Sequence, residues 1–187
     1  MNSMRTKEIK AIIFDLGDVV IPYNKTKAAI IFARLFWAKD RGLIRRYETG
    51  EVSFTHDFVD LIEKKSFPLF KEIKPEMRNL ILSLKKAYKT AALSNTINPH
   101  KDYMLEHYPL KEMFDYLFFS CEMGMRKPEP KIYTTALDKM NVKPENVIFI
   151  DDMKRNVDAA KDNGISGILF CSPYALKKNL EKLAIEV

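Results

Sequence analysis

Two short apolar runs, far apart in the chain, each end on aspartate. Residues 12–14 precede Asp15, residues 147–150 precede Asp151 and Asp152, and each run reads as a buried strand of a parallel sheet. If the two strands are neighbours, their acids meet at the carboxyl edge of the sheet, where open α/β folds bind ligands. Carboxylates that lie so near to one another repel each other and attract a hard cation such as Mg²⁺. A single such aspartate is more often a helix cap or turn residue, but two strand ends, one of them doubled, favour a metal-dependent acid site.

Polar residues also follow two further strand-like runs. Ser94 and Asn95 come after the run at residues 90–93, and Lys127 comes after the run at residues 117–119. Taken alone, Ser94 and Asn95 fit a helix cap, and Lys127 fits a solvated loop lysine. At strand ends beside the aspartates, they instead offer a hydroxyl, a backbone N–H and a positive charge to an anionic ligand.

The elements that would position these residues alternate along the chain. Strands are expected at residues 10–14, 90–93, 117–119, 147–150 and 167–170. Helices are expected at residues 75–88, 98–108, 130–140, 154–163 and 173–184. Strands that alternate with helices form a doubly wound parallel sheet, so the predicted fold class is α/β with a Rossmann-like core.

Residues 21–74 interrupt this alternation with a helical pattern and no convincing strand. Helices are expected at residues 26–39 and from Ser53 onward. An insert of about 50 residues is too long for a strand–helix connection, so we interpret it as a small all-helical cap over the edge that holds the acids. The predicted domains are a catalytic core of residues 1–20 and 75–187 and a helical cap of residues 21–74.

Composition limits the other possibilities. The chain has 187 residues, 47% of them hydrophobic, which is enough for one core with a small appended domain. Its net charge of +6 is spread along the chain without an aromatic-interleaved basic stripe, so no nucleic-acid partner is expected. The longest apolar stretch, residues 28–38, is shorter than the ~20 residues that span a bilayer, and no secretory signal is recognised. Two cysteines without a CxxC pair indicate a reducing compartment, so we expect a cytoplasmic protein. We also expect it to bind no membrane and to be a monomer or a weak homodimer.

At its strand ends the sequence resembles the haloacid dehalogenase-like (HAD) hydrolase superfamily, over nearly the whole chain. The four motifs of that superfamily are matched in order and spacing by FDLGDV from residue 14, LSNT from residue 93, GMRKP from residue 124, and DD from residue 151 with Asn156, Ala159 and Gly164 after it. Each motif alone is weak, but together on the expected strand ends they are strong. The resemblance implies a phosphatase that uses Mg²⁺ to hydrolyse a small cytoplasmic phosphate ester, and a small helical cap after the first motif.

The resemblance also implies a role for each acid. Asp15 would attack phosphorus and form an aspartyl-phosphate that water later hydrolyses. Asp15, Asp151, Asp152 and the backbone carbonyl of Gly17 would hold the Mg²⁺, which screens the negative charge of the phosphate from the nucleophile.

Further motif residues would bind the phosphoryl group and support the metal. The Ser94 hydroxyl and the Asn95 backbone N–H would bind phosphoryl oxygens. Lys127 would bind the phosphoryl group and act with Asp15 in catalysis. Asn156, one turn into the following helix, would reach toward metal-bound water.

Gly17 departs from the pattern of most phosphatases in this superfamily, which carry a second aspartate there to protonate the leaving group. Loss of a positioned general acid costs ~10²–10⁴ in rate. Asp18 is adjacent, but strand alternation would aim it away from Asp15 unless the backbone turns at Gly17. A subgroup with the same FDLG motif includes phosphatases of the alpha-glucose-1-phosphate type, so we expect substrates whose leaving group departs easily to be preferred over simple alkyl phosphates.

Two alternative functions are compatible with the sequence. The first is a phosphate-binding or regulatory protein with little or no turnover, and Gly17 is its only support. The second, less favoured, is a haloacid dehalogenase in which Asp15 attacks carbon; that chemistry needs no metal and leaves Asp151 and Asp152 without a purpose.

In this superfamily, residues of the cap usually choose the substrate. The segment at residues 47–53 resembles a turn often found in these caps. Packing or surface exposure is the better expectation for each residue that could contact the leaving group, namely Tyr23, Trp37, Arg45, Arg46 and His56.

Overall fold

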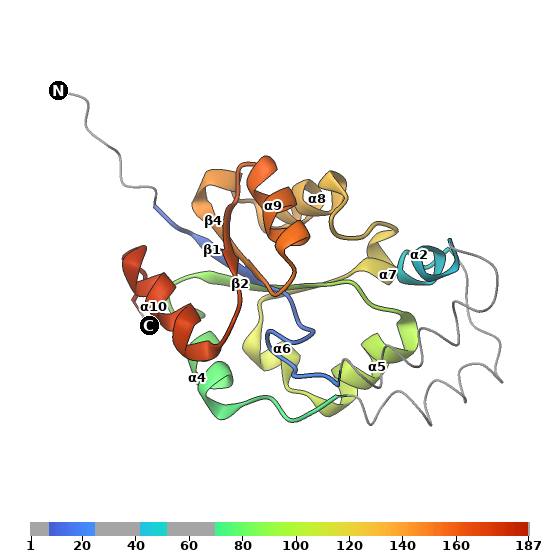
Figure 1. The fold of residues 1–187 in the computed structure, drawn as a ribbon, viewed down its shortest axis with the longest axis horizontal. Helices are drawn as coiled ribbons and strands as arrows, with labels where there is room; N and C mark the ends of the chain where they lie inside the picture. The colour runs from blue at the N-terminus through green and yellow to red at the C-terminus, as the bar shows by residue number, and fades with distance from the viewer. Residues whose placement is uncertain (1–7, 25–41, 52–69, 187) are drawn as a thin grey trace.

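The computed structural model describes residues 8–24, 42–51 and 70–186 (Figure 1). Its centre is a five-stranded sheet in the order β3-β2-β1-β4-β5, in which every neighbouring pair is parallel. The strands are β1 (Ala11–Phe14), β2 (Lys89–Ser94), β3 (Tyr116–Phe119), β4 (Val147–Asp151) and β5 (Ser166–Leu169). The predicted doubly wound parallel sheet is thus confirmed, and every strand begins and ends within one residue of its predicted position.

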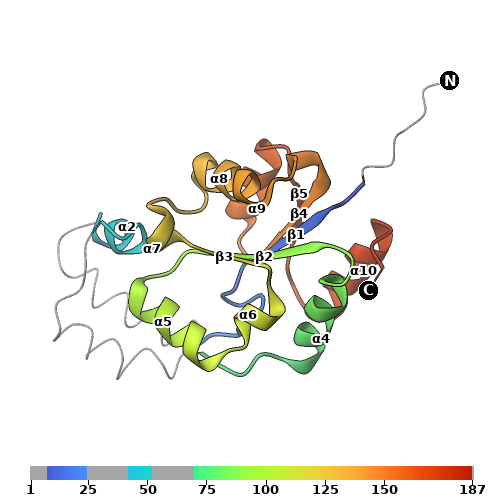
Figure 2. The same ribbon diagram turned by 180° about the vertical axis from the view of Figure 1, so that it is seen from behind.

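Helices cover both faces of the sheet (Figure 2). One face carries α8 (Pro130–Met140) and α9 (Lys154–Asp162); the other carries α4 (Pro75–Leu84), α5 (Asn98–His107), α6 (Leu110–Met113) and α10 (Pro173–Lys182). Along β1, Ile12 and Phe14 are buried in the cluster that includes α4, α6 and α10, whereas Ala11 and Ile13 are buried with α8 and α9. A strand buried on both faces needs apolar residues at every position, which explains the unbroken apolar runs of the sequence.

The helices differ from their predicted bounds in a few places. Helix α8 has its predicted bounds, but α4 ends at Leu84 rather than at residue 88, because Lys86 and Ala87 form tighter turn bonds to residues 83 and 84. Elements of one or two turns carry too few residues to show a period, so four were not predicted: α2 (Leu43–Glu48), α6, α7 (Ser120–Met123) and the 3₁₀ helix η2 (Pro144–Asn146). The helices predicted at residues 26–39 and from Ser53 lie outside the described residues.

The chain forms a tight loop directly after β1, and Gly17 and Ile21 form a parallel bridge across it. The backbone N–H groups of Val20 and Ile21 donate to the Leu16 carbonyl at 2.9 and 2.8 Å, and the Asp18 N–H donates to the Ile21 carbonyl at 2.9 Å. Asp18 takes a left-handed backbone conformation with φ of 58°, which aspartate tolerates better than most residues. The strand therefore stops at Phe14, and the strand alternation that would aim Asp18 away from Asp15 does not apply.

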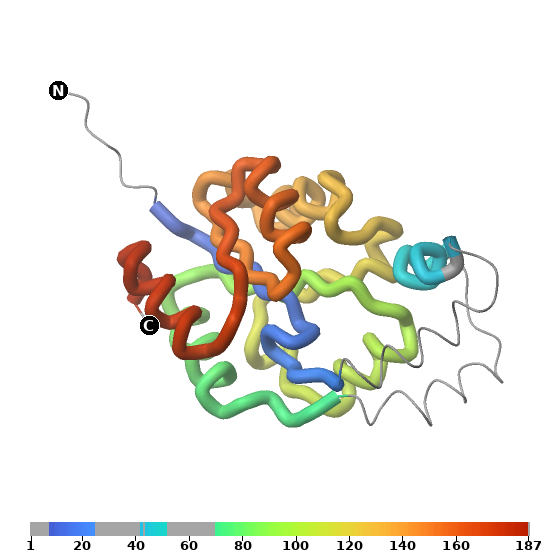
Figure 3. Tube along the Cα trace, viewed as in Figure 1, coloured from blue at the N-terminus to red at the C-terminus, as the bar shows by residue number. Residues whose placement is uncertain are grey.

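The two ends of the insert lie side by side (Figure 3). Tyr23 and Phe70 form an antiparallel bridge, and the Lys71 N–H donates to the Pro22 carbonyl at 2.9 Å. The chain thus leaves and re-enters the core at one place, although the cap at residues 21–74 stays a prediction because much of it lies outside the described residues. Among the described helices, none has the length and apolar character needed to cross a membrane.

Candidate active site

Three carboxylates meet at the carboxyl edge of the sheet. Phe14 lies opposite Ile150 in the parallel β1–β4 register, so the residues that follow, Asp15 and Asp151, are brought together. Asp15, Asp151 and Asp152 each offer a carboxylate oxygen within 4.8 Å of the others. The acid cluster predicted from two strand ends therefore forms.

The ammonium of Lys127 lies within this cluster. Its Nζ donates to Asp15 Oδ1 at 2.7 Å and to Asp151 Oδ2 at 2.8 Å, and the side chain is only 1% exposed. Lysine is almost never buried without a partner, because an ammonium removed from water needs opposite charge close by. Two carboxylates supply it here, so this residue is not a solvated loop lysine.

Burial and mutual charge shift the pKa values in the cluster. Burial raises the pKa of Asp15 to about 7; Lys127 opposes this rise, and the neighbouring Asp151 adds to it. Burial by itself lowers the pKa of Lys127, but Asp15 and Asp151 outweigh burial and raise that pKa above its usual range. Lys127 is therefore charged at neutral pH, whereas Asp15 takes up a proton near neutrality.

Asn95 holds the backbone of Lys127. Its Nδ2 donates to the Lys127 carbonyl and its Oδ1 accepts the Lys127 N–H, both at 2.8 Å. A side-chain amide carries both the donor and the acceptor that this pairing needs. The sequence predicted a role for the Asn95 backbone and missed this side-chain role, which depends on a loop 32 residues away in the chain.

Ser94 ends β2 at the same edge and is 5% exposed. The segment after it is joined to the start of α7, because the Thr96 N–H donates to Ser120 Oγ at 2.9 Å and Ser120 Oγ donates to the Thr96 carbonyl at 3.1 Å. Sequence analysis did not single out Ser120; its buried hydroxyl keeps the end of β2 against the segment that leads to Lys127.

Asn156 orients Asp151. Its Nδ2 donates to both carboxylate oxygens of Asp151 at 3.0 Å, and the Met153 N–H donates to Asp151 Oδ1 at 2.8 Å. The other amide atom, Asn156 Oδ1, is buried and has no hydrogen-bond partner in the described part of the chain. A buried acceptor in that state calls for a donor such as an ordered water.

Gly17 has open space around it. A Cβ added at Gly17 would meet no described atom within 4 Å. Asp18, the next residue, accepts a hydrogen bond from the Tyr23 N–H at 3.0 Å through Oδ1.

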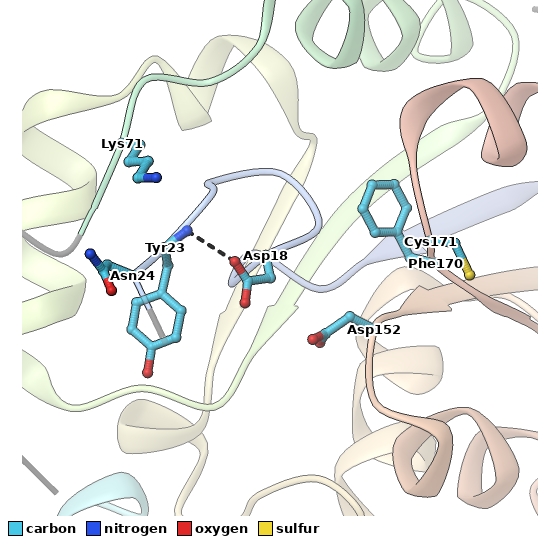
Figure 4. Close-up of a pocket in the computed structure, with 7 residues that line it drawn as sticks. All are labelled: Asp18, Tyr23, Asn24, Lys71, Asp152, Phe170 and Cys171. Atoms are coloured by element: carbon cyan, nitrogen blue, oxygen red, sulfur yellow. Dashed lines mark hydrogen bonds between the residues drawn. The ribbon is translucent and has the colours of Figure 1, made fainter. Parts of the chain in front are cut away.

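A pocket of about 510 Å³ adjoins the acid cluster, with which it shares Asp152. Its lining residues are Asp18, Tyr23, Asn24, Lys71, Asp152, Phe170 and Cys171 (Figure 4). The carboxylates of Asp18 and Asp152 face this space from the loop after β1 and from the end of β4. Of the residues suggested to contact a leaving group, Tyr23 therefore lies at the site, Arg45 pairs with Glu51 and Glu129, Arg46 is exposed, and Trp37 and His56 lie outside the described residues.

The sequence matches a family model for haloacid dehalogenase-like hydrolases over residues 9–164, a range that contains the acid cluster and Lys127. The chain belongs to this family. The HAD resemblance inferred from the four motifs is thus confirmed, and the protein is a HAD hydrolase.

Several known proteins are similar to this HAD hydrolase. D-ribitol-5-phosphate phosphatase of Bacteroides thetaiotaomicron is 28% identical over 184 residues, which cover 83% of this chain and 89% of that protein. Bifunctional epoxide hydrolase 2 of Mus musculus is 33% identical over 114 residues, covering 59% of this chain, but this chain spans only 21% of that protein. The magnesium complex of a HAD family enzyme from Bacteroides thetaiotaomicron aligns with a TM-score of 0.74 at 25% identity, covering 88% of this chain and 94% of that one.

Proposed function

We propose that this HAD hydrolase is a Mg²⁺-dependent phosphatase that acts on a small phosphorylated metabolite, a sugar or polyol phosphate, through an aspartyl-phosphate on Asp15. The observation that carries the proposal is the buried Asp15 carboxylate, 2.7 Å from the Lys127 ammonium and grouped with Asp151 and Asp152. The similarity to D-ribitol-5-phosphate phosphatase along most of both chains supports the reaction and the substrate class.

The residues present fit a divalent cation. Three carboxylate oxygens lie within 4.8 Å of one another, which suits a hard ion with oxygen ligands. The buried Asn156 Oδ1 without a partner in the described structure would accept a hydrogen from a water of that ion. Asp15, Asp151, Asp152 and the Gly17 carbonyl would hold the cation, and the similar enzyme with magnesium supports Mg²⁺. When bound, Mg²⁺ screens the phosphate charge from the nucleophile.

The residues of this chain would then catalyse two successive displacement reactions at phosphorus. A carboxylate oxygen of Asp15 forms a bond to phosphorus while the bond between phosphorus and the leaving-group oxygen breaks. Lys127 Nζ, the Ser94 hydroxyl and the Asn95 N–H donate to the phosphoryl oxygens and stabilise their charge. Water next forms a bond to the phosphorus of the aspartyl-phosphate while the bond between phosphorus and the Asp15 oxygen breaks, which restores the Asp15 carboxylate. One hydrogen of the water stays on the released phosphate, and the other passes through solvent to the oxygen of the leaving group.

The pocket beside Asp152 suits a polyhydroxylated leaving group. The carboxylate of Asp18 accepts hydrogen bonds from hydroxyls, Asn24 and Lys71 donate them, and Phe170 offers an apolar surface. Gly17 supplies no acid to protonate that group, so an oxygen that departs easily, such as an anomeric oxygen, is favoured.

Gly17→Asp is expected to raise kcat/KM for alkyl phosphates about 10–100-fold, since it places a carboxylic acid where the leaving group needs a proton. The open space at Gly17 accommodates the new side chain. Steady-state kinetics on alkyl and aryl phosphates test this, and Gly17→Asn, of equal size but unable to transfer a proton, is the matched control. Equal kcat/KM values for the two variants would contradict the inference that Gly17 stands where a general acid is missing.

The affinity for Mg²⁺ is expected to weaken as the pH falls below about 7. Burial raises the pKa of Asp15 from its ordinary 3.8 to about 7, and a protonated Asp15 is a poor ligand, so protons compete with the metal. The dissociation constant should grow about 10-fold per pH unit below pH 7. Calorimetric titration of Mg²⁺ between pH 8 and pH 5.5 measures it, and a constant affinity down to pH 5.5 would argue against Asp15 as a ligand.

Hydrolysis of an aryl phosphate with and without Mg²⁺ tests the proposed function directly, because an aryl leaving group needs little help from an acid. Turnover that requires Mg²⁺ supports the phosphatase. Binding of Mg²⁺ and inorganic phosphate without turnover would favour the regulatory alternative, for which Gly17 is the supporting observation. Release of halide from a haloacid without metal would instead identify a dehalogenase.

A further inference from the structure

Helix α2 and the turn after it, residues 49–51, sit against the segment of the core that leads to Lys127. α2 contacts α7, and the two lie side by side in both ribbon views (Figure 1, Figure 2). At the turn, Gly50 has a φ of +71°, and a Cβ there would clash with the Cys121 carbonyl oxygen. The turn is therefore seated directly on α7, with no room for a side chain at Gly50.

Two ion pairs join α2 to the loop between α7 and α8, and they flank Lys127 in sequence. Arg126 Nη1 lies 2.7 Å from Glu48 Oε2, and these side chains are 22% and 14% exposed. Arg45 Nε lies 3.3 Å from Glu129 Oε1 in a more exposed pair. Exposed pairs contribute little to stability, so the less exposed Glu48–Arg126 pair carries more of this contact, as an ion pair in which Glu48 Oε2 has no hydrogen bond among the described residues.

Lys127 is thus held on two sides. Asn95 binds its backbone N–H and carbonyl from the end of β2, while Glu48 holds the residue just before it from α2. A charged group that must meet a phosphoryl oxygen and Asp15 at once needs its backbone placed within about 0.5 Å. Contacts to its loop therefore bear on how well Lys127 works.

Arg126 offsets the negative charge of Glu48 near the site. Burial raises the pKa of Glu48, whereas Arg126, Arg155 and Lys127 lower it. A carboxylate that senses Lys127 would, by its charge alone, weaken the binding of phosphate nearby. A net-neutral pair with Arg126 avoids that cost and keeps the mechanical contact.

We propose that Glu48 and Arg126 are positioning residues: their ion pair docks α2 of the insert onto the loop that carries Lys127, and this docking sets Lys127 for phosphate binding. The inference rests on the proposed role of Lys127 in binding the phosphoryl group. It gives the described part of that segment, residues 47–51, a role in positioning Lys127 rather than in contact with the leaving group.

Glu48→Gln and Arg126→Gln test the proposal because they change the charge near the site in opposite directions. Positioning predicts that both weaken the binding of inorganic phosphate to the Mg²⁺-loaded protein, and lower kcat/KM for an aryl phosphate, by about 10–100-fold. An effect of charge alone predicts opposite signs, with tighter phosphate binding in Glu48→Gln. The double variant should bind phosphate no more weakly than the more impaired of the two single variants, because all three variants remove the same ion pair.

Three further measurements separate positioning from a loss of folding. The affinity for Mg²⁺ alone should stay unchanged, since the acid cluster is intact, and Tm should lie well above the assay temperature. Glu122→Gln is the matched control: Glu122 lies on α7, and the substitution breaks its ion pair with Lys101 of α5 without touching the Lys127 loop. It should leave phosphate affinity unchanged.

The outcomes distinguish this inference from the proposed function. Weaker phosphate binding in both variants supports the inference even if the wild-type protein shows no turnover. Unchanged phosphate affinity and kcat/KM, opposite signs, or a lower Tm alone would overturn it. If the wild-type protein neither binds phosphate nor turns over, the proposed function and the inference fail together.

Discussion

Asp15→Asn is expected to abolish the hydrolysis of aryl phosphates, with kcat/KM reduced by roughly 10⁴–10⁶-fold. An amide oxygen is too weak a nucleophile to form the bond to phosphorus, and asparagine is also a poorer ligand for a divalent cation. The substitution preserves size, and Lys127 keeps its hydrogen bond to Asp151 at 2.8 Å. The measurement is the release of inorganic phosphate in saturating Mg²⁺.

The same variant should remain folded, which separates chemistry from stability. Because the pKa of Asp15 in the folded protein is about 7 and its ordinary value is 3.8, the native state binds that proton more tightly than the unfolded state. Stability from this group is present below about pH 4 and is lost as the pH rises through about 7. Asparagine cannot ionise, so Tm in the absence of metal at pH 8 should not fall.

Asp158→Asn, on the exposed side of α9, is a suitable control for Asp15→Asn, because Asp158 forms an exposed ion pair with Lys154 one helical turn away. It should retain wild-type turnover. Substantial turnover by Asp15→Asn, comparable to that of the control, would rule out an aspartyl-phosphate on Asp15.

The acid cluster could be predicted from sequence because each of its parts is local. A short apolar run that stops on aspartate identifies a buried strand end, and parallel strands place such ends at one edge. The remaining step was the adjacency of β1 and β4, which the structure confirms through the Phe14–Ile150 register. No knowledge of loop conformation was needed.

The contacts that support the cluster could not be predicted in the same way. The Asn95 amide pairs with a backbone 32 residues away, and Glu48 lies in a six-residue helix that shows no visible period. Both contacts depend on how the loop before α8 folds back on β2 and α2. Sequence patterns report which face of an element is buried, whereas these polar contacts depend on three-dimensional positions of loops.

Lys127→Met is expected to lower the free energy of unfolding by about 3–5 kcal/mol, because it leaves the buried carboxylates of Asp15 and Asp151 without their shared cation. Urea denaturation at pH 8 in the presence of a chelator measures this. Mg²⁺ should then stabilise the variant more than the wild-type protein, since it replaces the missing positive charge between the same oxygens. Aryl phosphate turnover should stay far below wild type even in saturating Mg²⁺, because the phosphoryl oxygens still lack the ammonium.

Lys154→Met is the control for that experiment, because Lys154 forms an exposed ion pair with Asp158, one helical turn further along α9. Exposed pairs of this kind contribute little, so its stability should stay close to wild type with and without Mg²⁺. If Lys127→Met were equally stable in the chelator, the Lys127 ammonium would not be needed to balance the buried carboxylates, and the charge balance argued for the site would be wrong. If it were unstable and Mg²⁺ gave no added stabilisation, the acids would not form a metal site. The stability of Lys127→Met in the chelator therefore tests the role of the lysine, and its added stability in Mg²⁺ tests the cation that the cluster is proposed to hold.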